Sequence, residues 1–384
     1  MEVSRHLQNI RPSYIREILS VTRSHQVVSL AGGLPAMELI PVQLFAEAIQ
    51  SLTANTDLLQ YGETQGYEPL LDYIQASYQV SSLMGSMICN GSQQGLDLVA
   101  RAFINPGDKV VVEAPSYLGA LQVFGLAQAD IVPVTQTSTG PALDQLESLF
   151  ASNKIKLFYG VPDFHNPTGA CWSLDVRQAV ARLCQSYGVV FVEDAPYRDL
   201  RFSGQALPLV SSFCEQQSII LRSFSKIAAP GIRLGVVSAP HDDLSSMIKV
   251  KQAADLHTGL PMQAVLLQVL NNPAFPQYID SIRAAYKIRY EQFSELLTGL
   301  ADKDCYFDKV DGGMFVWLKL PAVDPMALAQ SLLEDGVAVV PSNVFYHNDD
   351  GMQPALRLNF TYCSAAALEI AVVKLGLVLD KISA

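Results

Sequence analysis

The sequence lacks any long apolar run, and positively charged residues are in the minority. No hydrophobic stretch approaches the about 18 residues that a membrane-spanning helix needs, so we expect no membrane segment. The first residues include Glu2, Arg5 and Arg11 and contain no apolar core typical of a signal peptide. The net charge is −11, which disfavours a surface that binds nucleic acid or an anionic membrane.

The cysteines show no spacing typical of a metal site or a disulfide framework. They are scattered along the chain, at Cys89, Cys171, Cys184, Cys214, Cys305 and Cys363. Neither CxxC nor CxxH occurs, so we expect no zinc site and no other metal. Reduced thiols in a cytoplasmic protein are the expectation that follows.

The chain is long and apolar enough to form more than one hydrophobic core. With 384 residues, of which 49% are hydrophobic, it suits two domains. Short apolar runs alternate with helical patterns, in which apolar residues recur at helical spacing. This alternation predicts an α/β fold with a mostly parallel central sheet covered by helices on both faces. The predicted strands are residues 110–112, 131–134, 157–159, 189–192 and 219–221.

The pattern changes after a further predicted strand at residues 236–238. A helical region with two interruptions follows over about residues 243–300, and the remainder mixes strands with helices. We therefore predict a large domain at residues 41–270. A smaller α+β domain is predicted to combine residues 271–384 with an N-terminal arm, residues 1–40.

One short segment gathers an amine, two hydroxyls and a guanidinium at the end of an apolar run. Residues 222–226 read RSFSK, and the segment PGIRLG follows closely. Lys226 can condense with an aldehyde, whereas Ser223, Ser225 and Arg233 can bind a phosphate. These groups together suit pyridoxal 5′-phosphate, a cofactor that carries both an aldehyde and a phosphate.

Further polar side chains follow the other predicted strands at their carboxyl ends. They are Tyr117, Asn166, Asp194 and Tyr197. Ligands of open α/β sheets bind outside the carboxyl ends of the strands. Residues 91–95, GSQQG, precede a helical pattern, and the free N–H groups of a helix N-terminus can bind a phosphate. We therefore expect one site that combines these side chains with the lysine segment.

These motifs resemble those of the fold-type I aminotransferases that depend on pyridoxal phosphate, in the class I and II branch. Within this branch, the chain is most similar to the group that contains 2-aminoadipate and kynurenine aminotransferases. The matching motifs extend from Ile15 to Asn359, nearly the whole chain. The resemblance implies the fold of type I PLP-dependent transferases, an aminotransferase activity, and pyridoxal 5′-phosphate as the cofactor.

The resemblance also implies roles for the residues around the cofactor ring. Lys226 is expected to hold the cofactor covalently and to move a proton between substrate and cofactor. Asp194 is expected to keep the pyridine nitrogen protonated, so that the ring can accept electrons. Asn166 and Tyr197 are expected to hydrogen-bond the phenolate oxygen of the ring, and Tyr117 to stack on its face.

The implied phosphate contacts come from this chain and from a second subunit. Within the chain they are Ser92, Gln93, Ser223, Ser225 and Arg233. Tyr61, in the segment QYG, resembles a family tyrosine that reaches the cofactor phosphate of the neighbouring subunit. The implied assembly is a homodimer with a shared active site.

The implied substrate contacts are Arg357, Arg16, Gly33 and Asn166. Arg357 is expected to bind the α-carboxylate with two parallel hydrogen bonds, and Gly33 to let the backbone approach the substrate. Arg16 lies where aminoadipate-type relatives place an arginine against the side-chain carboxylate of acidic substrates. We therefore expect a ping-pong transfer from an L-amino acid, such as 2-aminoadipate or glutamate, to a 2-oxo acid such as 2-oxoglutarate.

Several alternatives stay open. Arg16 could instead pair with a nearby Glu on a helix surface, and aromatic or branched donors are also compatible with a movable N-terminal helix. The same fold supports other PLP reactions, such as a C–S lyase or a decarboxylase, or a catalytically silent regulatory homologue. Two arginines favour transamination of a dicarboxylate, and the residues before Gly32 are too few for a DNA-binding domain. His165 and Asp163 depart from the pattern of the group, and these departures bear on the substrate rather than on the reaction class.

Overall fold

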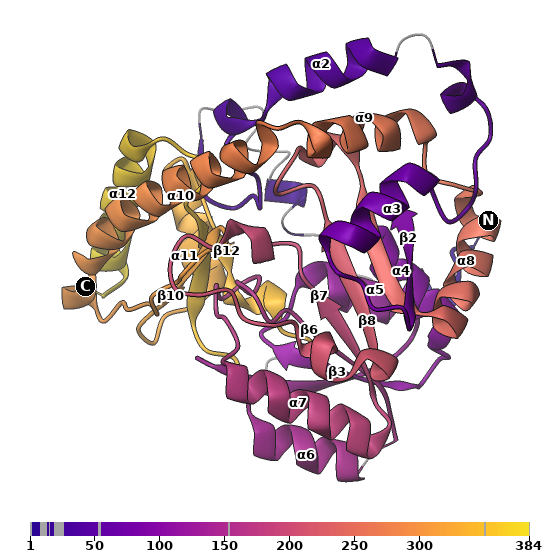
Figure 1. Ribbon diagram of the computed structural model, residues 1–384. Helices are drawn as coiled ribbons and strands as arrows, with labels where there is room; N and C mark the ends of the chain where they lie inside the picture. Colours follow the sequence, from indigo (N-terminus) through magenta and orange to yellow (C-terminus); the bar gives the residue numbers. More distant parts are fainter. Residues whose placement is uncertain are drawn as a thin grey trace.

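A computed structural model describes residues 2–7, 14, 16–18, 27–52, 55–152, 154–348 and 351–383 of the protein. The largest element is an eight-stranded sheet in the order β2-β9-β8-β7-β6-β3-β4-β5 (Figure 1). Its strands are β2 Met84–Cys89, β3 Lys109–Ala114, β4 Asp130–Thr137, β5 Gly140–Pro141, β6 Ile155–Gly160, β7 Val190–Asp194, β8 Ser218–Ser223 and β9 Gly235–Pro240.

The sheet is mostly parallel, as the sequence predicts. β8, β7, β6, β3 and β4 pair in parallel, whereas β9 runs antiparallel between β2 and β8. Every predicted strand overlaps an observed one. β2 is not predicted from the sequence, because Gly85 and Ser86 interrupt its apolar pattern and weaken the strand signal.

Hydrophobic cores cover both faces of this sheet, which confirms the predicted arrangement of layers. Along β3, Val110 and Val112 belong to one core, and the intervening Val111 belongs to another. This alternation follows from the period of two in a β-strand. The helices that contribute to the first core include α4 Ser92–Phe103, α5 Leu118–Leu126 and α8 His241–Asp255, and those of the second are α6 Leu143–Ser152 and α7 Leu174–Tyr187.

The predicted helical region after the sheet forms α8 and two further helices. These are α9, Leu260–Asn271, and α10, Phe275–Thr298. Both begin with a proline in the first turn, where the missing N–H group has no intrahelical partner to lose. Helix α2, Val42–Leu52, lies along α9, and α3 is Glu68–Ser77 (Figure 1). Helix α10 extends from the end of α9 to α12, against which it packs (Figure 1).

The C-terminal part forms a smaller unit with two sheets. An antiparallel sheet has the order β10-β13-β12, and a two-stranded sheet pairs β1 with β11. β1, which lies in the predicted N-terminal arm, pairs with β11 of this smaller unit, and the division into domains stays a prediction. The elements are β1 Val28–Ser29, β10 Phe315–Lys319, α11 Pro325–Glu334, β11 Val337–Ala338, β12 Val340–Pro341, β13 Ala355–Asn359 and α12 Ala365–Ser383.

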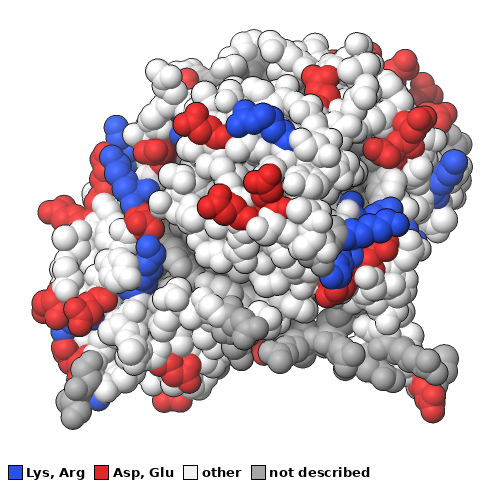
Figure 2. Space-filling model, turned by 90° about the horizontal axis from the view of Figure 1, so that it is seen from below, with Lys and Arg blue, Asp and Glu red and all other residues white. Residues whose placement is uncertain are grey.

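Short 3-10 helices connect the longer elements. They are η1 Arg5–Leu7, η2 Met37–Leu39, η3 Thr56–Leu59, η4 Arg198–Leu200, η5 Val210–Phe213, η6 Glu215–Gln217, η7 Pro230–Ile232, η8 Ala301–Lys303 and η9 Ser342–Phe345. Within the described part of the chain, no helix has both the length and the apolar character needed to cross a membrane. One face of the molecule shows basic and acidic side chains interspersed rather than segregated (Figure 2).

Candidate active site

A cavity of about 330 Å³ lies at the carboxyl ends of the central strands. Most of the residues predicted from the sequence line it together. They are Gly33, Ser92, Gln93, Tyr117, Asn166, Asp194, Tyr197, Ser223, Ser225, Lys226, Arg233 and Arg357. A larger hollow of about 500 Å³ lies between the large sheet and β10 and is lined by none of them, so the chemistry points to the smaller cavity.

Lys226 follows β8 and carries the only amine on the described wall of this cavity. Its Nζ donates a hydrogen bond to the backbone oxygen of Gly33, at 2.7 Å. Burial, together with the nearby charges of Arg233 and Arg357, lowers the pKa of this lysine to about 8. Near pH 7, a lysine with a lowered pKa is neutral for a larger fraction of the time than an ordinary lysine. The neutral amine is the form that acts as a nucleophile and a base.

Asp194 ends β7 and presents a buried carboxyl to the cavity. Its Oδ2 accepts a hydrogen bond from the hydroxyl of Tyr159, at 2.7 Å. Its Oδ1 is buried and has no hydrogen-bond partner among the described residues. Burial raises the pKa of Asp194 to about 6, although the bond from Tyr159 opposes this shift. The unpartnered oxygen suits a ligand N–H, such as a protonated ring nitrogen.

The opposite end of the cavity is suited to a phosphate. The N-terminus of α4 opens there, and its first N–H groups have no intrahelical acceptor. Arg233 lies against it, with Nη2 donating to the Asn90 oxygen at 3.3 Å and Nη1 to Ser225 Oγ at 3.4 Å. The backbone N–H of Ser225 in turn donates to Ser223 Oγ. Gly91 precedes α4 with a φ of +81°, a backbone conformation that favours glycine.

Tyr117 is held in place by the side chain of Gln93. The tyrosine hydroxyl donates to Gln93 Oε1 at 3.0 Å, and Gln93 Nε2 donates to the Gly119 oxygen at 3.2 Å. Burial raises the pKa of Tyr117 to about 12. The side-chain amide of Gln93 is occupied by these two hydrogen bonds. The backbone N–H of Gln93, in the first turn of α4, therefore remains to bind a phosphate.

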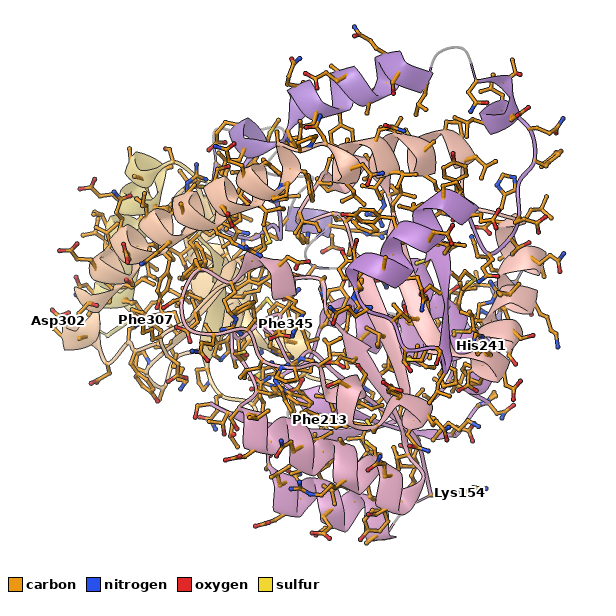
Figure 3. The ribbon with its side chains drawn as sticks, viewed as in Figure 1. Lys154, Phe213, His241, Asp302, Phe307 and Phe345 are labelled. Carbon is orange, nitrogen blue, oxygen red and sulfur yellow. The ribbon has the colours of Figure 1, made fainter. Side chains whose placement is uncertain are left out.

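Arg357, in β13, is buried rather than exposed on a strand surface. Its Nη1 donates to Asn166 Oδ1 at 2.8 Å, and its Nη2 donates to the Ala31 oxygen. The guanidinium lies 4.4 Å from the ring centre of Phe315 and 5.2 Å from that of Phe345, which lies in the interior of the molecule (Figure 3). Its Nε is buried without a partner among the described residues. A rigid, partly unsatisfied donor of this kind suits a carboxylate.

Two predicted residues do not line the cavity. Arg16 is exposed in a short helical segment, so its predicted contact with the substrate stays a prediction. Tyr61 is 78% exposed, and its ring contacts His257 edge-on at 5.9 Å. Its predicted contact with a second subunit therefore stays a prediction.

The sequence analysis missed a buried carboxyl at the end of β3. Glu113 Oε1 accepts hydrogen bonds from Gln136 Nε2 and from Trp172 Nε1, both at 2.9 Å. Its Oε2 accepts from the Val161 N–H at 3.1 Å and lies 3.5 Å from His165 Nε2. Burial raises the pKa of Glu113 to about 7 and lowers that of His165 to about 3. Glu113 thus anchors the loop that carries Asn166. The only sign of this role in the sequence is a charged residue at the end of an apolar run.

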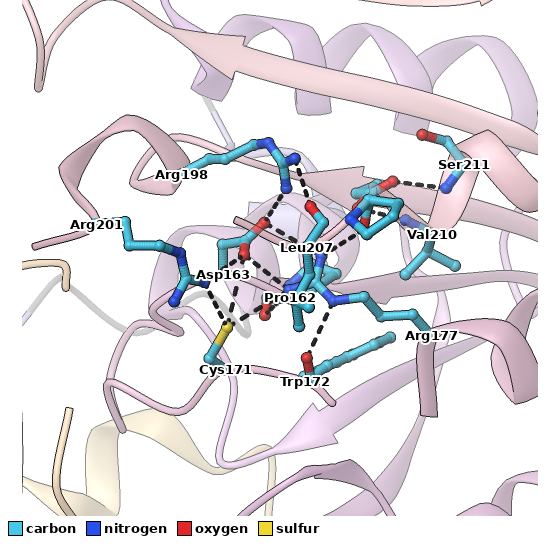
Figure 4. A network of polar contacts seen from close by, with 12 residues as sticks. Pro162, Asp163, Cys171, Trp172, Arg177, Arg198, Arg201, Leu207, Val210 and Ser211 are labelled. Carbon is cyan, nitrogen blue, oxygen red and sulfur yellow. Dashed lines mark hydrogen bonds and ion pairs between the residues drawn. The ribbon is translucent and has the colours of Figure 1, made fainter. Parts of the chain in front are cut away.

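A second buried carboxylate, Asp163, lies in the same loop and is surrounded by arginines (Figure 4). Asp163 forms ion pairs with Arg177 at 2.7 Å, Arg198 at 3.0 Å and Arg201 at 3.4 Å. Burial acts to raise the pKa of Asp163, but the arginines outweigh it and hold that pKa below its ordinary value. Asp163, which departs from the pattern of the related group, thus pairs with arginines and does not line the cavity.

Comparison with known proteins identifies the family. Residues 26–375 match the family model for aminotransferase class I and II. The chain belongs to this family. The aminotransferase is 35% identical over 367 residues to the aromatic-amino-acid aminotransferase 1 of Thermococcus litoralis, covering 92% of this chain and 88% of that protein. It is 34% identical over 374 residues to the 2-aminoadipate transaminase of Thermus thermophilus, covering 96% and 94%.

A solved structure agrees with this assignment. The crystal structure of Pyrococcus horikoshii kynurenine aminotransferase in complex with PMP, with KYN as substrate and KYA as product, matches with a TM-score of 0.94. The sequence identity is 32%, and the match covers 99% of this chain and 97% of that one. The aminotransferase is thus a PLP-dependent enzyme of fold type I. Its cavity fits this cofactor, because it offers an amine, an unpartnered buried carboxylate oxygen and an arginine at a helix N-terminus.

Proposed function

We propose that this aminotransferase transfers the amino group of an acidic L-amino acid, 2-aminoadipate or glutamate, to a 2-oxo acid such as 2-oxoglutarate. The observation that carries the proposal is the buried guanidinium of Arg357 in the cavity wall, whose Nε has no partner among the described residues. Arg16, exposed on the N-terminal segment, is the second cation that we assign to the substrate. Two guanidinium groups match the two carboxylates of a dicarboxylic substrate. The relative named 2-aminoadipate transaminase supports this substrate class.

Aromatic donors are the second candidate. They are supported by the names of the two other relatives, an aromatic-amino-acid aminotransferase and a kynurenine aminotransferase. Arg16 is exposed and lies on a short N-terminal segment. If this segment moved away from the substrate, the space near the substrate side chain would admit an apolar group. Arg357 would bind the α-carboxylate of either class of donor.

We propose the following division of work among the residues. The bound cofactor supplies an electron sink for the bond that breaks at the substrate α-carbon. Lys226 Nζ holds the cofactor and, once released, moves the proton of the α-carbon. Asp194 holds the proton of the ring nitrogen, and Arg357 orients the substrate carboxylate. Because amino donor and 2-oxo acid occupy the same cavity in turn, the kinetics are ping-pong.

Two substitutions test the substrate assignment. Arg357→Lys removes the rigid fork that binds the α-carboxylate, so KM is expected to rise about 10–100-fold for acidic and aromatic donors alike. Arg16→Ala is expected to raise KM only for glutamate and 2-aminoadipate. Arg101→Ala, which removes an exposed arginine on α4, is the matched control and should change neither. Unchanged kinetics of Arg16→Ala with acidic donors would remove the acidic substrate class and leave the aminotransferase reaction intact.

We further propose a homodimer in which Tyr61 contacts the cofactor phosphate of the partner. Leu59, Tyr61 and Leu256 are large and exposed by more than half, and the Tyr61 ring contacts His257, the neighbour of Leu256 in the chain. This exposed apolar surface supports burial against a second copy. Mixing the Lys226→Ala and Tyr61→Ala variants tests this. In a mixed dimer, one site combines Lys226 of the Tyr61→Ala subunit with Tyr61 of the Lys226→Ala subunit. Activity should therefore increase when the two weakened or inactive proteins are mixed. Absence of any recovery in mixed dimers would exclude a shared site.

A further inference from the structure

A separate cavity of about 190 Å³ lies behind the ends of β7 and β8. Typical pockets for drug-sized ligands measure about 300–1,000 Å³, so this one admits only a small ligand. It shares the Ser223 side of β8 with the cofactor cavity, and the two are otherwise lined by different residues. The lining residues are Ser77, Tyr78, Gln79, Ala195, Arg198, Asp199, Leu209, Arg222 and Ser223.

Arg222 gives this cavity a buried cation that forms no ion pair with any residue the structure describes. Its relative exposure is only 9%, and its Nη1 is buried with no hydrogen-bond partner. Within the described part of the chain, no Asp or Glu forms an ion pair with it. Its guanidinium lies 4.5 Å from the ring centre of Tyr78, which supplies a π face but no lone pair to Nη1. Since arginine stays protonated in proteins, the charge remains in place.

The other charged groups on the wall do not neutralise Arg222. Arg198 is a second cation, and its two terminal nitrogens already donate to Asp163 and to the Leu207 oxygen (Figure 4). Asp163 is itself shared with Arg177 and Arg201. Asp199 is the one acidic residue among the described residues of the lining. Its charge and that of Glu193 act on Arg222, but neither carboxylate forms an ion pair with it. The wall therefore carries more positive than negative charge.

We propose that this cavity binds a small oxyanion, a phosphate or a carboxylate, through Arg222. An unpaired charge in a protein interior is strongly unfavourable, and a bound anion would remove this penalty by pairing and hydrogen bonding with Nη1. Ser77 also lines this wall, and a serine hydroxyl can donate to an anion oxygen. The small volume restricts the ligand to an anion of a few heavy atoms.

The experiment uses the holoenzyme, because inorganic phosphate would otherwise compete for the cofactor phosphate site next door. The melting temperature is measured with excess pyridoxal phosphate while inorganic phosphate is added at constant ionic strength. A ligand at about 100 times its Kd is expected to raise the melting temperature of the wild type by roughly 2–4 °C. Sodium acetate, titrated in parallel, tells whether the site also accepts a carboxylate.

The matched variants are Arg222→Met and Arg182→Met. Arg222→Met should start at a melting temperature equal to or above that of the wild type, because it replaces an unpaired buried charge with an apolar chain of similar size. It should then show no response to either anion. Arg182 is exposed on α7, and its variant should respond like the wild type. Arg222→Lys keeps the charge and is expected to retain part of the response.

Two results would overturn the proposal. One is a wild-type holoenzyme whose melting temperature follows neither phosphate nor acetate. The other is an Arg222→Met variant that responds as strongly as the wild type, which would assign the effect to another surface. A response to acetate alone, lost in Arg222→Met, would support the site and restrict it to carboxylates.

Discussion

Tyr159 donates its hydroxyl to Asp194 across neighbouring parallel strands, with 2.7 Å between Oη and Oδ2. Both side chains are buried, and this is the one hydrogen bond that the Asp194 carboxyl accepts from a side chain of the described residues. The register of β6 and β7, in which Tyr159 pairs with Val192, fixes their separation. Packing of the sheet thus sets the position of a carboxyl that faces the cofactor cavity.

We predict that Tyr159→Phe weakens cofactor binding. Without the donor, the ionised form of Asp194 loses support, its pKa rises further above about 6, and the proposed contact with the ring nitrogen weakens. The loss of one such hydrogen bond corresponds to about a 5–30-fold rise in the Kd for pyridoxal phosphate, measured by fluorescence titration. Tyr290→Phe is the control, because it removes a buried hydroxyl that accepts from the distant Val310 N–H. An equal effect in both variants would point to general destabilisation.

We predict that cofactor uptake by the cofactor-free protein follows the titration of Lys226. The amine must be neutral to react, and its pKa is lowered from 10.5 to about 8 by burial and by two arginines. The uptake rate, followed by absorbance, should therefore rise about tenfold per pH unit below pH 8 and level off above it. The same titration of pyridoxal phosphate with a small amine corrects for the cofactor. A midpoint near 10.5 would contradict the lowered pKa.

Much of the cavity could be predicted because its residues lie in short motifs at strand ends. Lys226, Asn166 and Asp194 each follow an apolar run, and a parallel sheet brings such ends to one edge. Arg357 lies in the smaller unit, and only the resemblance to known aminotransferases predicted its place at the cavity. Tyr61 and Arg16 do not line the cavity. The role predicted for Tyr61 requires a second subunit, and the role predicted for Arg16 requires the N-terminal segment to contact the substrate.

The buried polar groups behind the cavity could not be predicted from local patterns. Glu113 meets His165, which is 52 positions away, and Arg222 stacks on Tyr78 of a different element. Each of these residues alone would be expected on the surface, because charged side chains are seldom buried. Only the tertiary structure shows that they are buried and which groups they face.

We predict that Glu113 makes stability fall as pH rises. Its pKa is raised from 4.5 to about 7, so between these values the native state binds a proton that the unfolded state has released. The free energy of unfolding should therefore decrease across this window by up to about 3 kcal/mol, at about 1.36 kcal/mol per pKa unit. His165 stays neutral there, because its pKa is lowered to about 3.

Glu113→Gln provides the measurement. Urea denaturation at pH 5 and pH 8 should show that the advantage of the wild type over this variant is smaller at pH 8. Glu147→Gln, which changes an exposed residue of α6, should keep a constant difference from the wild type. A wild-type advantage that grows between pH 5 and pH 8 would mean that Glu113 is stabilised as a carboxylate.

The cluster around Asp163 supplies the last prediction. Asp163→Asn would leave Arg177, Arg198 and Arg201 without their shared carboxylate, and Arg177 is fully buried. An uncompensated buried charge costs about 3–5 kcal/mol, so the midpoint of urea denaturation should fall strongly. Arg198→Gln should cost far less, because Asp163 keeps two arginines and Arg198 is partly exposed. If the two variants lost equal stability, the cluster would act as separate pairs rather than as one carboxylate shared by three cations.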